Sequence, residues 1–252
     1  MKKWALITGA SQGIGEEFVL ELAKRNYSLV LVARNLEKLN KLKSDIEKAN
    51  SVEVISLAID LNKVGSVQKL IQETSSFNIE LIILAAGFGT SGEFLENSIT
   101  DEMDMIDLNC KVVVELTHHF GNKFKQVKKG GIVLFSSIVA FQGVARTAVY
   151  SATKAFIQSF AEAIRDELKA YNVQVIACAP GPVQSGFAER AKMKMGKAQN
   201  VAGIAKETLD QLGKVTTVRP GFLSKLLGYS LATSPRVVRR IIMNKIMSEM
   251  TY

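Results

Sequence analysis

Cysteine, proline and histidine are scarce in this 252-residue sequence, which has 2 Cys, 4 Pro and 2 His. So few thiols exclude a small secreted scaffold held together by disulfides. With only 18 Gly, the chain also lacks the composition of collagen or of a low-complexity disordered protein. We therefore expect a globular protein of a reducing, cytoplasmic compartment.

Long apolar runs are also missing. The apolar stretch near the start covers only Trp4 to Ile7, which is too short for a secretory signal. A long stretch without charge, Ala170 to Phe187, contains two prolines and several amide side chains, and no membrane helix combines these. The sequence predicts neither export nor a membrane-spanning segment.

The positive charge is concentrated near the end of the chain. The net charge is +8; residues 1–188 hold 20 basic and 20 acidic residues, whereas residues 189–252 hold 12 basic and 4 acidic. A local excess of this kind attracts phosphates, acidic lipid surfaces or anionic substrates, and it also occurs on a merely solvated basic face. The charge alone does not choose between these.

Short apolar runs alternate with segments of helical periodicity. This alternation predicts a Rossmann-type α/β fold: a doubly wound parallel sheet in three layers, with helices on both faces, in a single domain over 1–252. Within it, residues 183–252 are expected to form a substrate lid and a basic amphipathic end. Strands are predicted at Trp4–Thr8, Leu29–Val32, Val52–Ala58, Leu81–Ala86, Ile132–Ser136 and Val173–Ala179. The clearest helices are expected near Asp101–Lys125, Val149–Tyr171 and Val201–Leu212, with a loop over Pro180–Asn200.

A glycine-rich turn follows the first predicted strand. The segment TGASQGIG places Gly9, Gly13 and Gly15 between that strand and a helix. Glycines allow a tight turn and a close approach of the backbone to a pyrophosphate, and the following helix offers free amides and a positive dipole end. The context predicts a dinucleotide site.

The end of the second strand indicates which dinucleotide binds. Sites that prefer NAD commonly have an acidic residue there to accept from the ribose hydroxyl. Here Ala33 and Arg34 follow instead, and a guanidinium suits a 2′-phosphate. We therefore predict NADP(H), with Ser11 as a second contact.

A second group of polar residues carries the chemistry. Tyr150 and Lys154 are four residues apart on one predicted helix, and Ser137 ends a strand at the crevice where ligands sit in such sheets. A phenol, with a pKa of about 10, exchanges protons poorly at neutral pH unless its anion is stabilised. A neighbouring ammonium is expected to lower that pKa by roughly two units.

With these motifs in the right order, the chain resembles the short-chain dehydrogenase/reductase family over nearly its whole length. The resemblance implies that Tyr150 is the general acid or base, that Lys154 lowers its pKa and binds the nicotinamide ribose, and that Ser137 holds the substrate oxygen. It further implies that Asn109, in DLNC, holds a water beside the lysine.

The resemblance extends to the rest of the cofactor site. Asp60 matches a residue that contacts adenine, and in the segment PGPVQS Val183 and Ser185 match those that hold the carboxamide. The family's N-N-A-G reads Leu84, Ala85, Ala86, Gly87 here, and we expect this loss of two asparagines to loosen the site. The full set expected to bind the cofactor is Gly9, Ser11, Gly13, Ile14, Gly15, Arg34, Asp60, Leu61, Ala86, Gly87, Tyr150, Lys154, Pro180, Gly181, Val183 and Ser185.

The implied activity is NADP(H)-dependent hydride transfer to or from a carbonyl or alcohol of a small-molecule substrate, in a homodimer or homotetramer. A hydrophobic ketone, steroid or acyl chain fits better than a sugar, and Lys192, Lys194 and Lys197 suit a phosphate-bearing carrier. The competing interpretation is a cofactor-binding sensor or scaffold without turnover. No metal site is predicted, because His118 and His119 lack ligand spacing. Nucleic-acid binding is not expected either.

The cationic end of the chain, Phe222 to Tyr252, alternates apolar and basic residues. Three roles suit such a segment: lying on an anionic membrane surface, covering the substrate pocket, or forming a subunit contact. The sequence leaves all three open.

Overall fold

A computed structural model describes residues 2–184, 186–191, 193 and 200–250. Parallel strands form one sheet in the order β3-β2-β1-β4-β5-β6-β7. This is the Rossmann-type parallel sheet that the alternating pattern predicts. The strands are β1 (Trp4–Thr8), β2 (Ser28–Ala33), β3 (Val54–Ala58), β4 (Ile79–Leu84), β5 (Gly130–Phe135), β6 (Val173–Cys178) and β7 (Thr217–Val218).

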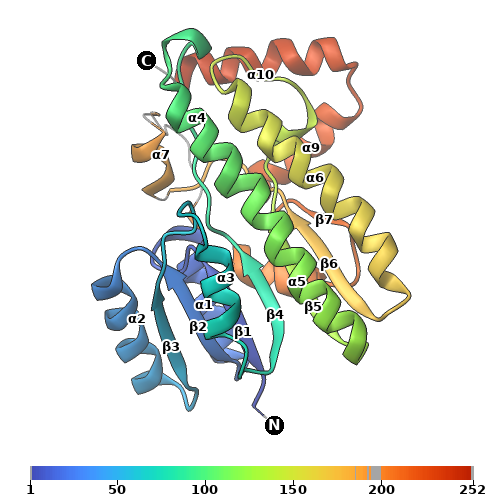
Figure 1. Cartoon of the computed structure of the whole chain (residues 1–252). Coiled ribbons are helices and arrows are strands. Elements are labelled where there is room, and N and C mark those ends of the chain that lie inside the picture. The colour runs from blue at the N-terminus through green and yellow to red at the C-terminus, as the bar shows by residue number, and fades with distance from the viewer. Residues whose placement is uncertain (1, 185, 192, 194–199, 251–252) are drawn as a thin grey trace.

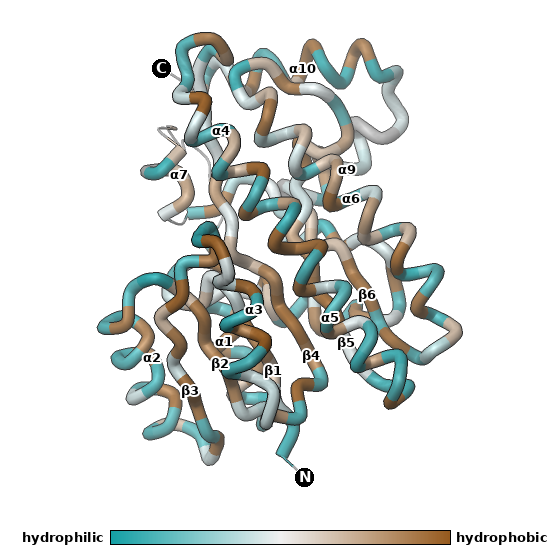
Figure 2. The backbone as a smooth tube through the Cα atoms, viewed as in Figure 1, coloured by the Kyte–Doolittle hydropathy of each residue, from teal (hydrophilic) through white to brown (hydrophobic). Residues whose placement is uncertain are grey.

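Helices cover both faces of this sheet and give three layers (Figure 1). Alternate strand residues point to opposite faces, so Leu6 and Ile82 pack on one side and Ile7 and Ile83 on the other. The strands are rich in buried hydrophobic residues, which are drawn brown in Figure 2. One helix layer is α3 (Ser66–Glu73), α5 (Val112–Val127) and α6 (Ala148–Lys169), and the other is α1 (Gly13–Lys24), α2 (Leu36–Ala49) and α8 (Ile204–Gln211).

The strand order reverses between β1 and β4. The chain runs outward from β1 to β2 and β3, then returns to place β4 on the other side of β1. In open α/β sheets a crevice forms at the carboxyl ends of the strands where the order reverses. At this place Gly9 has a φ of +68°, and a Cβ there would lie 2.8 Å from the Ala86 nitrogen. A side chain at position 9 would therefore be strained and would clash.

Three elements differ from the prediction. The single helix expected over Asp101–Lys125 consists of α4 (Ile99–Ile106), the π-helical turn η2 (Asp107–Lys111) and α5. The loop expected over Pro180–Asn200 contains the short helix α7 (Gly186–Arg190). The strand β7 was not predicted, because a strand of two residues leaves no period to detect.

The chain ends in two further helices, α9 (Phe222–Ala232) and α10 (Arg236–Met250). Figure 1 shows α10 at the end of the molecule opposite the N-terminus. Short 3-10 helices η1 (Phe94–Glu96) and η3 (Ile138–Phe141) precede α4 and α6. Among the described helices, none has the length and apolar content needed to cross a bilayer.

Candidate active site

A cavity of about 800 Å³ opens at the carboxyl ends of the strands. The predicted residues that line it are Gly9, Ser11, Gly13, Ile14, Gly15, Arg34, Asp60, Leu61, Ala86, Gly87, Ser137, Tyr150, Lys154, Pro180, Gly181 and Val183. Asn109 lies beside the cavity without lining it, and Ser185 falls outside the described residues. Sequence reasoning therefore placed most of these side chains in one space, although they come from six strand ends and two helices.

The glycine turn forms a backbone cradle at one end of the cavity. Gly9 and Gly13 both have positive φ angles, and a Cβ on Gly15 would collide with the Gly9 carbonyl oxygen. Gln12 begins α1 without a side-chain capping bond, so the first amides of the helix remain available to an anion. This cradle fits the pyrophosphate of a dinucleotide.

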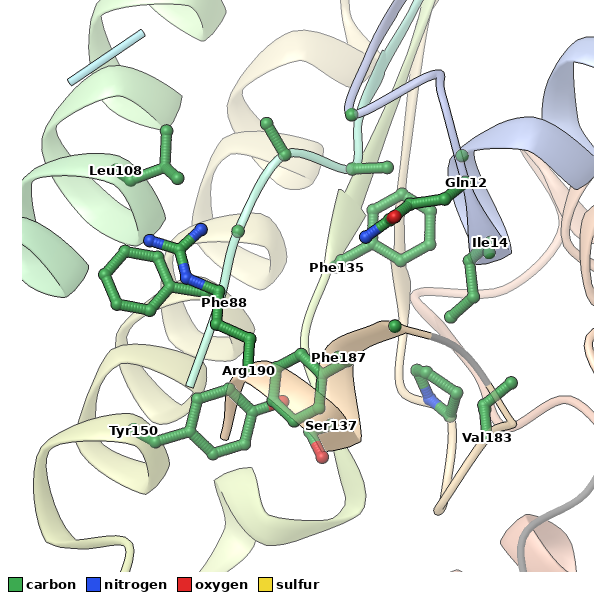
Figure 3. Close-up of a pocket in the computed structure, with 18 of the residues that line it drawn as sticks. Gln12, Ile14, Phe88, Leu108, Phe135, Ser137, Tyr150, Val183, Phe187 and Arg190 are labelled. Atoms are coloured by element: carbon green, nitrogen blue, oxygen red, sulfur yellow. The ribbon is translucent and has the colours of Figure 1, made fainter. Parts of the chain in front are cut away.

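Two arginines line the cavity. Arg34 follows β2, and Arg190 arrives from α7, its guanidinium carbon 3.6 Å from the centre of the Phe88 ring (Figure 3). Burial and the like charge of Arg34 lower the pKa of Arg190. The sequence did not predict Arg190, because nothing in the segment between β6 and α8 indicates that this side chain contacts Phe88, which follows β4.

Tyr150, Lys154 and Ser137 meet at the centre of the cavity. The Lys154 Nζ lies 5.6 Å from the centre of the Tyr150 ring and donates a hydrogen bond of 2.9 Å to the Phe135 carbonyl. Burial lowers the pKa of Lys154 to about 8. Ser137 caps η3 and accepts from the Val139 amide at 3.4 Å.

The expected effect of the lysine on the phenol is wrong for this structure. Burial raises the pKa of Tyr150 above its ordinary value, and a side-chain hydrogen bond with Ser137 opposes that rise. Lys154 supplies no resolved part of the shift, because burial disfavours its own charged form and its described hydrogen bond goes to Phe135. The desolvation that isolates the phenol therefore outweighs the attraction expected from the spacing.

Asn109 occupies the π-helical turn and is buried. Its Nδ2 donates to the Phe88 carbonyl at 2.8 Å and to the Thr153 hydroxyl at 3.2 Å, and its Oδ1 accepts from the Phe88 amide at 3.1 Å. A Cβ on Gly87 would lie 2.8 Å from this Oδ1 and 3.9 Å from the Lys154 Nζ. The side chain thus fixes the segment after β4.

The missing asparagine pair is replaced by packing. Leu84 is buried in the core, and the Ala86 amide donates to the Thr8 hydroxyl at 3.1 Å, so the ends of β4 and β1 are tied together. This hydrogen bond braces β4 against its neighbour β1, at the place where we expected a looser site.

The other end of the cavity is apolar. The Phe187 ring lies against that of Tyr150, with 5.2 Å between their centres (Figure 3). Met193, Leu227, Met243 and Met247 line the same space. Residues of α9 and α10 therefore line one wall of the cavity.

Comparison with known proteins agrees with this geometry. The family model for the short chain dehydrogenases matches residues 3–196. The very-long-chain 3-oxoacyl-CoA reductase of Coccidioides immitis is 30% identical over 84% of this chain, which spans 62% of that protein's length. The 7beta-hydroxysteroid dehydrogenase of Clostridium sardiniense is 26% identical, covering 88% of this chain and 87% of its own. A short-chain dehydrogenase from Sphingobium yanoikuyae, solved with NADPH, superposes with a TM-score of 0.83 at 24% identity, over 94% of this chain and 97% of its own.

The chain thus belongs to the short-chain dehydrogenase family. Its members are oxidoreductases that use a nicotinamide cofactor and act on carbonyl or hydroxyl groups of small molecules.

Proposed function

We propose that this chain is an NADP(H)-dependent oxidoreductase for hydrophobic carbonyl or alcohol substrates, with Tyr150 as its general acid and base. The observation that carries the proposal is the arrangement of one cavity: a glycine cradle and Arg34 at one end, Tyr150 between, and a methionine-lined wall at the other. Each part supports a separate step.

Cofactor choice rests on charge. Arg34, and not an acidic residue, directly follows β2, and both Arg34 and Arg190 line the cavity. A guanidinium pairs with a phosphate through parallel hydrogen bonds, and two positive groups in one space favour the cofactor with the additional phosphate. When bound, a nicotinamide cofactor supplies or accepts the hydride.

The protein's own residues handle the proton. In the reducing direction the Tyr150 hydroxyl donates its proton to the oxygen of the reduced carbonyl, while Ser137 hydrogen-bonds the same oxygen as negative charge develops. A phenol whose pKa is raised by burial is fully protonated at neutral pH, which suits donation. Lys154 and Asn109 hold the segments that frame the reacting groups.

Substrate class follows from the lining. Flexible thioether side chains adapt to apolar ligands of irregular shape, and Met243 and Met247 are buried at this wall. The two relatives named above are a very-long-chain 3-oxoacyl-CoA reductase and a hydroxysteroid dehydrogenase, and the long acyl chain and the steroid framework of those substrates are apolar. We therefore propose a ketone or alcohol on a hydrocarbon framework. Lys192, Lys194 and Lys197, considered for a phosphate-bearing carrier, lie outside the described residues.

The remaining proposals concern assembly and place. We propose that the chain forms a homodimer or homotetramer through α5 and α6, where Phe156 is exposed and stacks on Phe160. We also propose that it folds as a single domain and acts in the cytoplasm. Size-exclusion chromatography with light scattering tests the assembly: Phe156→Glu should lower the mass, and a wild-type monomer would refute it.

Consumption of NADPH and of NADH across a panel of linear ketones and steroid ketones tests the function. The proposal expects turnover with NADPH at least tenfold more efficient than with NADH, rising with substrate hydrophobicity. Tight NADPH binding without turnover on any member would favour the sensor or scaffold interpretation instead.

A further inference from the structure

The last helix has two faces of different character. Met243 and Met247 on its inner face are buried against the cavity wall, and the Asn244 side chain accepts a hydrogen bond of 2.8 Å from the Ala145 amide. These contacts fix the orientation of α10, so the side chains on its opposite face stay directed away from the core.

That opposite face is apolar where solvent would favour polar groups. Val237 is 59% exposed and Ile241 is 61% exposed, one turn apart, and Val238 and Ile242 beside them are also exposed. Isolated exposed aliphatic residues are ordinary, whereas a contiguous row of them indicates an interaction surface.

Cations surround this row. Arg236, Arg240 and Lys245 are exposed, and no described acidic side chain pairs with them. The sequence has no acidic residue between Asp210 and Glu249. Figure 2 shows hydrophilic and hydrophobic residues alternating along α10 at the outer edge of the molecule.

We propose that this face binds the surface of an anionic phospholipid bilayer. We call it the α10 outer face: Val237, Val238, Ile241, Ile242 and Lys245, together with the exposed Arg236 and Arg240 that lie beside them in the first turns of the helix. A helix that combines aliphatic side chains with arginine and lysine lies in the interface, with its apolar groups among the acyl chains and its cations at the headgroups.

A second copy of this chain suits the face less well. A symmetric contact would bring each set of cations against its own copy, and the single acidic residue of α10, Glu249, does not balance Arg236, Arg240 and Lys245. An anionic headgroup layer satisfies the cations and the aliphatic row together. The proposal concerns binding alone and does not depend on the reaction.

Sedimentation of the full chain with vesicles tests it. We expect at least tenfold more protein bound to phosphatidylcholine–phosphatidylglycerol vesicles than to phosphatidylcholine alone, with binding lost at high salt. Val237→Ser with Ile241→Ser should abolish binding. Arg236→Gln with Arg240→Gln and Lys245→Gln should reduce it at least tenfold and remove the salt dependence.

The matched control is Ile99→Ser with Met103→Ser on α4, which removes two equally exposed apolar side chains elsewhere and should leave binding unchanged. Circular dichroism of each variant confirms the fold. No binding by wild type, binding that survives both α10 variants, or a fall in molecular mass caused by them would overturn the proposal, the last by showing that the face joins two copies.

Discussion

Lys154 stands 5.6 Å from the centre of the Tyr150 ring, yet its hydrogen bond of 2.9 Å goes to the Phe135 carbonyl. The helical spacing of four residues brings the two side chains together, and burial decides what each does. Both pKa values move toward the neutral forms, upward for the phenol and downward for the amine. The site is thus a desolvated space that disfavours charge before any ligand enters.

Replacing Lys154 with Met should change how stability depends on pH. The pKa of Lys154 falls from 10.5 to about 8 on folding, so between these values the unfolded chain binds more protons and stability rises with pH. Methionine removes that dependence. Between pH 7 and pH 10.5, the free energy of unfolding of wild type should therefore rise relative to that of the variant by about 3 kcal/mol.

Denaturant unfolding of both proteins across this pH range measures the effect. Lys169→Met, an exposed lysine on the same helix, is the control and should show no such divergence. A difference between Lys154→Met and wild type that stays constant with pH would contradict the burial of the amine.

Arg34→Ala should weaken NADPH more than NADH. Loss of a hydrogen bond to a charged group costs about 1.5–3 kcal/mol, so the Kd for NADPH should rise roughly 10- to 100-fold while that for NADH changes little. Arg190→Ala should act in the same direction, because both arginines line the cavity and the charge of Arg34 acts on Arg190. Fluorescence titration gives both constants, with the exposed Lys41→Ala as control; equal losses for the two cofactors would reject the phosphate role.

Met247→Trp should restrict the enzyme to ketones with shorter chains, because the larger side chain fills part of the apolar end of the cavity. Each methylene that enters an apolar pocket contributes about 0.8 kcal/mol, or roughly fourfold in kcat/KM. Wild type should therefore show kcat/KM rising with chain length in a series of 2-ketones, and the variant should lose that rise beyond a certain length while short ketones are unaffected. Met103→Trp, on the exposed side of α4, should behave as wild type. Should the variant reduce long ketones normally, the substrate wall lies elsewhere.

Asn109→Ala should destabilise the fold as well as the site. The substitution leaves the Phe88 amide and carbonyl without their described side-chain partner, and each orphaned buried group costs about 1–3 kcal/mol. For the two groups together we expect a loss of roughly 2–6 kcal/mol in the free energy of unfolding. Asn122→Ala, at an exposed site on α5, should cost far less; similar losses for the two would argue against a bracing role for Asn109.

Local patterns predicted most of the sheet. Five-residue apolar runs such as Trp4–Thr8 and the glycine turn after it are continuous in sequence, so periodicity and turn chemistry find them. The π-helical turn at Asn109 was missed because its side-chain pattern is that of a continuous helix. Helix α7 was missed because Pro182 and the glycines around it resemble a loop.

The residues of the site also differ in whether the local sequence predicts them. Residues fixed by strand ends, such as Ser137 and Arg34, follow from their place in the sequence. Arg190 and Met247 reach the cavity only through the tertiary fold, and no local spacing announces them. The direction of the Tyr150 pKa was predicted wrongly because spacing reveals a nearby charge but not the degree of burial, which here is the larger effect.

Tyr150→Phe tests the central claim most directly, because it removes one oxygen and leaves the buried ring in place. The account predicts that the variant binds NADPH within about twofold of wild type, while its kcat for ketone reduction falls roughly 100- to 10,000-fold. A variant that still reduces ketones at nearly the wild-type rate would show that the proton comes from another group.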